Sequence, residues 1–280
     1  MLTSIFATDI HVSLKAEKLF TLGPVNVTNS MLYGAIVAIF LVIFMARVTR
    51  SIKVKPQKGA AGPVELVVDF ILGLIEGPLG SRAAAVKFAP YFASYFLFII
   101  VSNLTALLPI VGPGLTLNVG GEKTPLFRPF TADLNGTIAL AVIAIVMVQV
   151  LSIREQGGKN HLKHYFTDKP LNPINFFIGL LEVFGEFTRM ISLSLRLFLN
   201  TAVGEILVSV FTSMIVAGGR TPLAVLPILL FEMLVAGIQA YVFTVLAATY
   251  LGLATAHHAE HASHDELAHE PAPINGRGGA

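Results

Sequence analysis

One arginine, Arg196, stands in the middle of a long apolar run, in the stretch 192–205 that reads SLSLRLFLNTAVGE. A guanidinium stays protonated at any accessible pH, so it cannot lower the cost of a low-dielectric site by becoming neutral. At the centre of a membrane that cost is at least about 2.5–3.5 kcal/mol on insertion scales. Arg196 is therefore a functional candidate, and the first question is which negative charge it meets.

No acid lies within one helical turn of Arg196. Its neighbours at three and four positions are Ser192, Leu193, Leu199 and Asn200. Two structural alternatives remain open: the side chain could extend to the lipid headgroups, or it could form a permanent ion pair with Glu205 or Glu232. Glu205 lies about 180° round a helix and ~13 Å along it, so direct contact with it is not expected. We expect the counter-charge to come from another helix or another subunit.

Other polar residues share this apolar region. On a helix, one polar stripe would contain Glu182, Glu186, Arg189, Arg196 and Asn200. Arg189 has acids three and seven positions before it, so a local ion pair explains its presence.

Two isolated glutamates follow, and Gln239 lies two helical turns beyond Glu232 on the same face. Glu205 is the only ionisable residue between Arg196 and Arg220. Two carboxyl groups, a glutamine and water could pass a proton inward from one surface. The alternative is that protonated glutamates hydrogen-bond neighbouring helices and serve packing alone.

The composition indicates a membrane protein. Of 280 residues, 54% are hydrophobic and 13% are charged, against about 25% charged in a soluble domain. The absence of cysteine excludes disulfides, zinc–thiolate sites and iron–sulfur clusters. A net charge of +2 does not indicate nucleic acid, and no P-loop for nucleotide is present. We expect no cofactor.

The N-terminus resembles neither a cleavable signal nor a transit peptide, which favours a bacterial or organelle-encoded protein.

The apolar runs predict an all-α integral membrane protein with about five crossings. Three lie at about 27–48, 90–109 and 134–153, with a surface amphipathic helix at 63–82 whose acids share one face. The runs 173–217 and 222–256 would be ~67 Å and ~52 Å long as helices, against a hydrocarbon core of ~30 Å. We expect them to form a tilted hairpin. The predicted parts are thus 1–170, 171–256 and a polar tail at 257–280.

Basic residues alternate along the chain. Clusters follow the first and third crossings, with no acid in the first cluster: Arg47, Arg50, Lys53, Lys55 and Lys58, then Arg154, Lys159, Lys163 and Lys169. By the positive-inside rule both clusters are cytoplasmic, which places the N-terminus outside and the C-terminus inside. The tail, with His257, His258, His261, His264 and His269, is expected to be disordered, and we do not expect it to bind metal. Asp133 is expected to cap the helix that starts at Leu134.

Several motifs together resemble subunit a of the F-type ATP synthases. The match is densest over 171–256, and the earlier motifs are NLTALLP at 103–109 and TADLN at 131–135. The later motifs are Leu195-Arg196-Leu197-Phe198-x-Asn200, Gly204-Glu205 and Gln239-Ala240-Tyr241-Val242-Phe243. The resemblance implies a multi-pass subunit of the bacterial inner membrane that conducts protons and does no nucleotide chemistry. It implies contacts with the c-subunit ring, the b-subunit peripheral stalk and the remaining ATP synthase subunits.

The resemblance also implies residue roles. Arg196 would face the carboxylate of each passing c subunit and separate two half-channels. The outer half-channel would hold Asn200, Glu205, Glu232 and Gln239, and the inner one Glu182. The sequence departs from many relatives at two positions, with Leu199 in place of glycine and Glu232 in place of histidine.

A secondary transporter with an intramembrane Arg/Glu site is the alternative function. It would predict internal repeats and helices broken at mid-depth, and the sequence has neither. A purely structural scaffold is a third possibility, but it gives no reason for Arg196.

Overall fold

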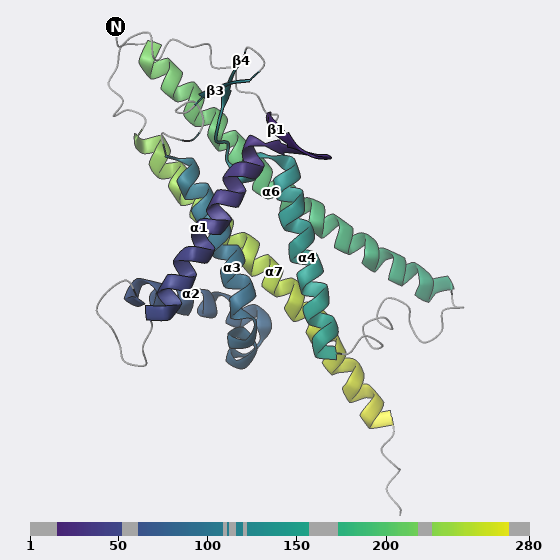
Figure 1. Cartoon of the computed structure of the whole chain (residues 1–280). Coiled ribbons are helices and arrows are strands. Elements are labelled where there is room, and N and C mark those ends of the chain that lie inside the picture. Colours follow the sequence, from purple (N-terminus) through teal and green to yellow (C-terminus); the bar gives the residue numbers. More distant parts are fainter. Residues whose placement is uncertain are drawn as a thin grey trace, which may run out of the picture.

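The computed structural model describes residues 16–51, 61–108, 111, 116–119, 122–156, 173–217 and 226–268. Helices dominate this part of the chain (Figure 1): α1 (Asn29–Ser51), α2 (Ala61–Leu79), α3 (Arg82–Ala106), α4 (Leu134–Gln156), α6 (Pro173–Ala217) and α7 (Leu226–Ala268). A short 3₁₀ turn, η1 (Phe130–Ala132), precedes α4.

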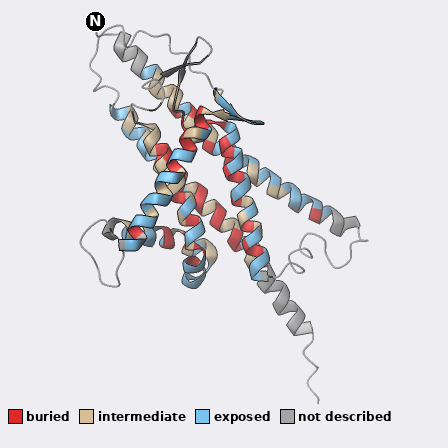
Figure 2. Cartoon of the chain, in the orientation of Figure 1, coloured by how far each residue is buried: buried red, intermediate tan, exposed pale blue. Residues whose placement is uncertain are grey.

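Five of these helices are long and apolar enough to cross a membrane. Their apolar spans are Asn29–Val48, Arg82–Ala106, Leu134–Glu155, Gly179–Phe211 and Leu226–Thr255. Many of their large apolar side chains point outward, as expected for helices in contact with lipid (Figure 2). The predicted class, an all-α integral membrane protein with five crossings, is confirmed.

The buried core joins α2, α3, α4, α6 and α7. One cluster of buried side chains includes Phe96 and Ile99 on α3, Leu193 and Leu197 on α6 and Phe243 on α7. Facing alanines on α4 and α7 also belong to the two clusters: Ala141, Ala144, Ala240, Ala247 and Ala248. Such small residues let helix backbones approach closely inside a membrane, where van der Waals packing holds helices together.

Helix α2 is the predicted surface helix, and it lies across the bundle near the end where α1 stops (Figure 1). It buries Ile71 and Ile75 against α3 and α7. Its acids Asp69 and Glu76 lie 3.6 and 3.1 Å from the guanidinium of Arg82. These pairs are half-exposed, so they contribute little to stability, and the buried face holds α2 in place.

The long helices α6 and α7 have the lengths of 45 and 43 residues that a steep tilt would accommodate. Helix α6 has the predicted bounds, whereas α7 begins at Leu226 instead of at 222. Both pack against α4, and the first part of α6 extends away from α4 and α7 (Figure 1).

Helix α7 also continues beyond the predicted end of the apolar run. The tail was predicted to be disordered from His257, but α7 reaches Ala268. Residues 256–268 contain four alanines and neither glycine nor proline, a composition that favours helix. The tail's side chains and residues 269–280 lie outside the described residues.

Two hairpins of short antiparallel strands lie at the end of the bundle where α1 begins. Strands β1 (Lys18–Leu22) and β2 (Val25–Thr28) are joined at Gly23, whose φ of 61° suits glycine. Helix α1 follows β2 directly and begins at Asn29, close to the predicted start of the first crossing at about 27. The second hairpin, β3 (Thr116–Val119) and β4 (Glu122–Pro125), was not predicted.

Other boundaries differ for local reasons. Helix α3 begins at Arg82 rather than at 90, because Ser81 caps it by accepting a hydrogen bond from the Ala84 N–H and because the helix continues through Pro90. Six of the basic residues used for the predicted orientation lie outside the described residues: Lys53, Lys55, Lys58, Lys159, Lys163 and Lys169.

Two glycines make room for Phe130. A Cβ at Gly136 of α4 would lie 2.7 Å from the backbone oxygen of Phe130, and one at Gly34 of α1 would lie 2.9 Å from Cγ of its ring. Gly34, Gly136 and Phe130 thus dock the segment before α4 between α1 and α4.

We predict that Gly136→Ala lowers the thermal midpoint of the protein in detergent, since overpacking at a backbone contact costs about 1–3 kcal/mol. Gly73→Ala on α2 is the matched control, because a Cβ at Gly73 has nothing within 4 Å. Equal midpoints for the two variants would contradict the docking role of Gly136.

Candidate functional site

Arg196 lies on the outward face of α6. Among the residues that the structure describes, no carboxylate lies within ion-pair distance of its guanidinium. The ion pair with Glu205 or Glu232 that the sequence left open is not formed. The counter-charge of Arg196 is therefore not supplied by the described part of this chain.

An exposed apolar stripe runs along α6 beside Arg196. Its members recur every three or four residues: Leu180, Phe184, Phe187, Ile191, Leu195, Leu199 and Val203. Leu199, at the position noted above, is 52% exposed. The helix thus presents one charge at the edge of an otherwise apolar surface that no described element covers.

Asn200 and Gln239 join α6 to α7. The Asn200 side-chain amide donates to Oε1 of Gln239 at 3.3 Å. Gln239 is only 4% exposed, and its Nε2 has no partner among the described residues. Asn200 lies one turn beyond Arg196, so this polar contact lies near the arginine. The contact joins two residues that the family resemblance assigned to the outer half-channel, and that role stays a prediction.

The two isolated glutamates come together at the same end of α6 and α7. The Glu232 carboxyl group lies against Gly204, the residue before Glu205, and a Cβ at Gly204 would be 2.7 Å from Cδ of Glu232. Glycine at 204 therefore leaves the space that the Glu232 carboxyl group occupies. The Glu205 side chain is 29% exposed.

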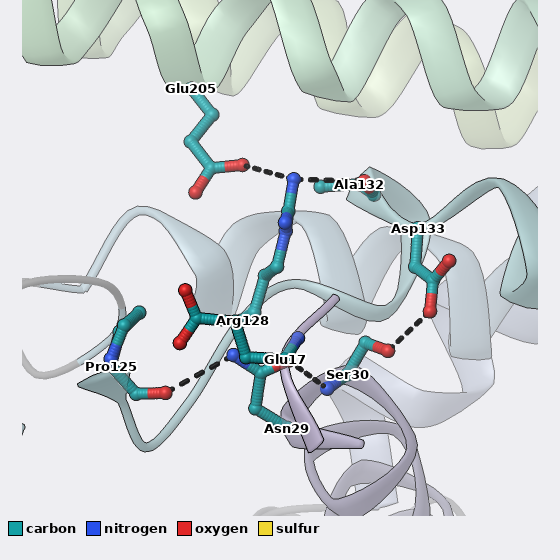
Figure 3. A network of polar contacts seen from close by, with 8 residues as sticks. All are labelled: Glu17, Asn29, Ser30, Pro125, Arg128, Ala132, Asp133 and Glu205. Carbon is teal, nitrogen blue, oxygen red and sulfur yellow. Dashed lines mark hydrogen bonds and ion pairs between the residues drawn. The ribbon is translucent and has the colours of Figure 1, made fainter. Parts of the chain in front are cut away.

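The partner of Glu205 is a residue that sequence reasoning missed, Arg128. The Arg128 Nη2 atom lies 3.9 Å from Oε2 of Glu205 and donates to the Ala132 carbonyl at 3.4 Å (Figure 3). Arg128 is only 3% exposed. Its neighbours, in PLFRPFTAD at 125–133, are mostly apolar, and that signal predicts burial.

Polar residues at the start of α4 tie this end of the bundle together. Asp133 accepts from the Asn135 N–H at 3.1 Å, which confirms the predicted cap. Its other oxygen accepts from the Ser30 hydroxyl of α1. The Thr131 hydroxyl donates to Asn103 of α3 at 2.6 Å.

The remaining charges of α6 behave differently from Arg196. Arg189 pairs with Glu186 at 2.7 Å and lies 4.9 Å from the Tyr250 ring centroid, so the predicted local ion pair is confirmed. Glu182 belongs to α6, but its side chain lies outside the described residues.

Comparisons with known proteins identify the family of this chain. A family described as "ATP synthase A chain" matches residues 30–252, which include nearly all of the five crossings. The chain belongs to the ATP synthase subunit a family. The alternative of a secondary transporter is not favoured.

Curated relatives cover most of both chains. ATP synthase subunit a of Moorella thermoacetica is 32% identical over 85% of this chain and 95% of its own length. The subunit a of Trichlorobacter lovleyi is 32% identical over 86% of this chain and 92% of its own. That of Geotalea daltonii is 34% identical over 78% and 85%.

The contact between Asn200 and Gln239 can be tested by cross-linking, since the chain has no cysteine. We predict that Asn200→Cys with Gln239→Cys is joined by a short bifunctional thiol reagent in membranes. Leu199→Cys with Gln239→Cys is the control, because Leu199 is turned outward. Equal cross-linking of the two pairs would contradict the arrangement of α6 and α7.

Proposed function

We propose that this chain is the stator subunit that conducts protons in the membrane sector of an ATP synthase. Protons pass through two offset half-channels, and their flow turns a neighbouring ring of c subunits. Nucleotide chemistry takes place on other subunits. The observation that carries this proposal is Arg196, a permanent charge on an outward helix face with no acid beside it in the described part of the chain.

The exposed stripe of α6 is the surface proposed to face the c ring. It is apolar, as a contact between membrane-embedded helices requires, and Arg196 lies at its edge. A carboxylate on each c subunit would complete the ion pair as it passes. The peripheral stalk of b subunits and the remaining synthase subunits are further proposed partners.

Arg196 would act electrostatically. A fixed positive charge favours the ionised form of a carboxylate that stops beside it, because unlike charges attract strongly at low dielectric. The same charge repels a proton that would otherwise pass directly between the half-channels. Each proton must therefore travel round with the ring.

The outer half-channel is proposed to contain Asn200, Glu205, Glu232 and Gln239. Asn200 of α6 contacts Gln239 of α7, and the Glu232 carboxyl group of α7 lies against Gly204, the residue before Glu205. Glu182 is proposed to lie on the inner half-channel. It precedes Glu205 by 23 positions, which is ~34 Å along a straight helix, so the two paths are offset.

The proposed orientation has the N-terminus outside and the C-terminus in the cytoplasm of a bacterium. Basic residues gather at the end of the bundle where α1 and α4 stop and α3 starts: Arg47, Arg50, Arg82, Lys87 and Arg154. The positive-inside rule places that end in the cytoplasm. The site with Glu205 then faces the outer compartment.

Replacing Arg196 with alanine should lower proton-driven ATP synthesis in reconstituted vesicles by about 10²-fold or more. The substitution removes the fixed positive charge that would favour the ionised carboxylate of the c subunit. Arg189→Ala is the control on the same helix, because Arg189 has a local partner, and it should retain most of the activity. Coupled synthesis at the wild-type rate in Arg196→Ala would refute the proposal.

Replacing Glu205 with glutamine keeps the side-chain shape but removes the proton-carrying group. We expect proton pumping to slow by about tenfold or more, in line with the loss of a positioned proton-transfer group, while the complex assembles normally. Dye-quenching assays on inverted vesicles measure this rate. Unchanged pumping would assign Glu205 to packing alone.

A further inference from the structure

We propose that Arg128 is a positioning residue that holds the Glu205 carboxylate at the mouth of the outer half-channel, and that the first turn of α1 holds Arg128 in place. This role rests on the function proposed above for Glu205. It adds to that function a fixed cation and a support that reaches across the bundle from α1.

Arg128 carries a buried positive charge. Its side chain is 4% exposed, and its contacts include the Ala132 carbonyl at 3.4 Å and the Glu205 carboxylate at 3.9 Å. A buried guanidinium is stable only when it is paired and hydrogen-bonded. The Ala132 contact fixes the head group, and Glu205 supplies the opposite charge across from α6 (Figure 3).

Two consecutive residues of α1 clamp the segment that carries Arg128. The Asn29 side chain donates to the Pro125 carbonyl at 3.1 Å, and the Ser30 hydroxyl donates to Asp133 (Figure 3). These contacts lie on either side of Arg128 in the sequence. Asn29 and Ser30 are fully buried. The backbone that bears Arg128 is thus held at both ends by one helical turn.

Two further contacts stiffen the clamp. The Glu17 N–H, just before β1, donates to Oδ1 of Asn29 at 3.2 Å, which connects the start of the first hairpin to α1. The Thr131 hydroxyl donates to Asn103 on α3 at 2.6 Å. The position of Arg128 is therefore set by α1, α3 and the start of α4, none of which belongs to the α6–α7 hairpin.

The distance between the two charges suits a residue that must exchange protons. At 3.9 Å the pair is longer than a hydrogen bond of 2.7–3.2 Å, so Arg128 attracts the carboxylate without occupying its oxygens directly. Three further carboxyl groups lie at this end: Glu232 on α7, and Glu17 and Asp133 beside Arg128.

The test compares Arg128→Met with Arg128→Lys in the assembled synthase in vesicles. Methionine keeps an unbranched side chain without charge, whereas lysine keeps the charge. We expect Arg128→Met to slow proton pumping by about fivefold or more and Arg128→Lys to stay within about twofold of the wild type. In the Glu205→Gln background, Arg128→Met should change the rate by less than about twofold, because coupled residues are not additive.

A pH profile separates positioning from a merely structural role. The rate of ATP synthesis is measured against the pH of the outer compartment. Arg128→Met should shift this pH profile along the pH axis. Lys87→Gln, which removes an exposed ion pair to Glu155 at the other end of the bundle, should leave the profile unchanged. Ser30→Ala loosens the clamp without touching either charge. It should lower the rate in the wild-type background and not in the Glu205→Gln background.

The outcomes are distinct. Wild-type pumping in Arg128→Met, or the same loss whether residue 205 is glutamate or glutamine, would overturn the positioning role. If Arg128→Met does not assemble, Ser30→Ala decides by the same comparison of backgrounds. Wild-type pumping in Glu205→Gln would instead refute the function proposed for Glu205.

Discussion

The structure depends on one constraint, the guanidinium of Arg196. It cannot lose its proton, and it lies in a largely apolar helix with no acid beside it among the described residues. An unpaired charge in a membrane is costly, so we propose that Arg196 meets a negative charge outside the described part of this chain. The exposed apolar stripe of α6 and the length of α6 and α7 fit that need. Together they form a broad helical surface around Arg196, against which a second membrane subunit can pack.

Three arginines, Arg128, Arg189 and Arg196, differ in how they meet a negative charge. Arg189 pairs with an acid one turn away, Arg128 reaches an acid on another helix, and Arg196 has neither. The acid nearest in sequence on the far side of Arg196, Glu205, is directed toward Arg128. The two positive charges thus have different proposed roles. Arg128 is proposed to hold a carboxylate of this chain, and Arg196 to pair with the carboxylate of each c subunit that passes.

Much of the fold could be predicted because it depends on local pattern. Apolar length identified all five crossings, and the periodic acids identified α2. Helical spacing placed Asn200 with Arg196 and Gln239 with Glu232, whereas the group of four with Glu205 came only from the family resemblance. Arg128 escaped because its burial depends on Asn29 and Ser30, which are about a hundred positions away and act through tertiary contacts. The extension of α7 and the β3–β4 hairpin were missed since polar composition alone does not separate helix or strand from coil.

The most direct measurement is an experimental structure of the assembled synthase with this chain in place. In at least one rotary position, the Arg196 guanidinium should lie within about 4 Å of a carboxylate on the neighbouring ring, the usual limit of an ion pair. Arg196 paired with an acid of its own chain, or directed to lipid headgroups in every position, would contradict the account.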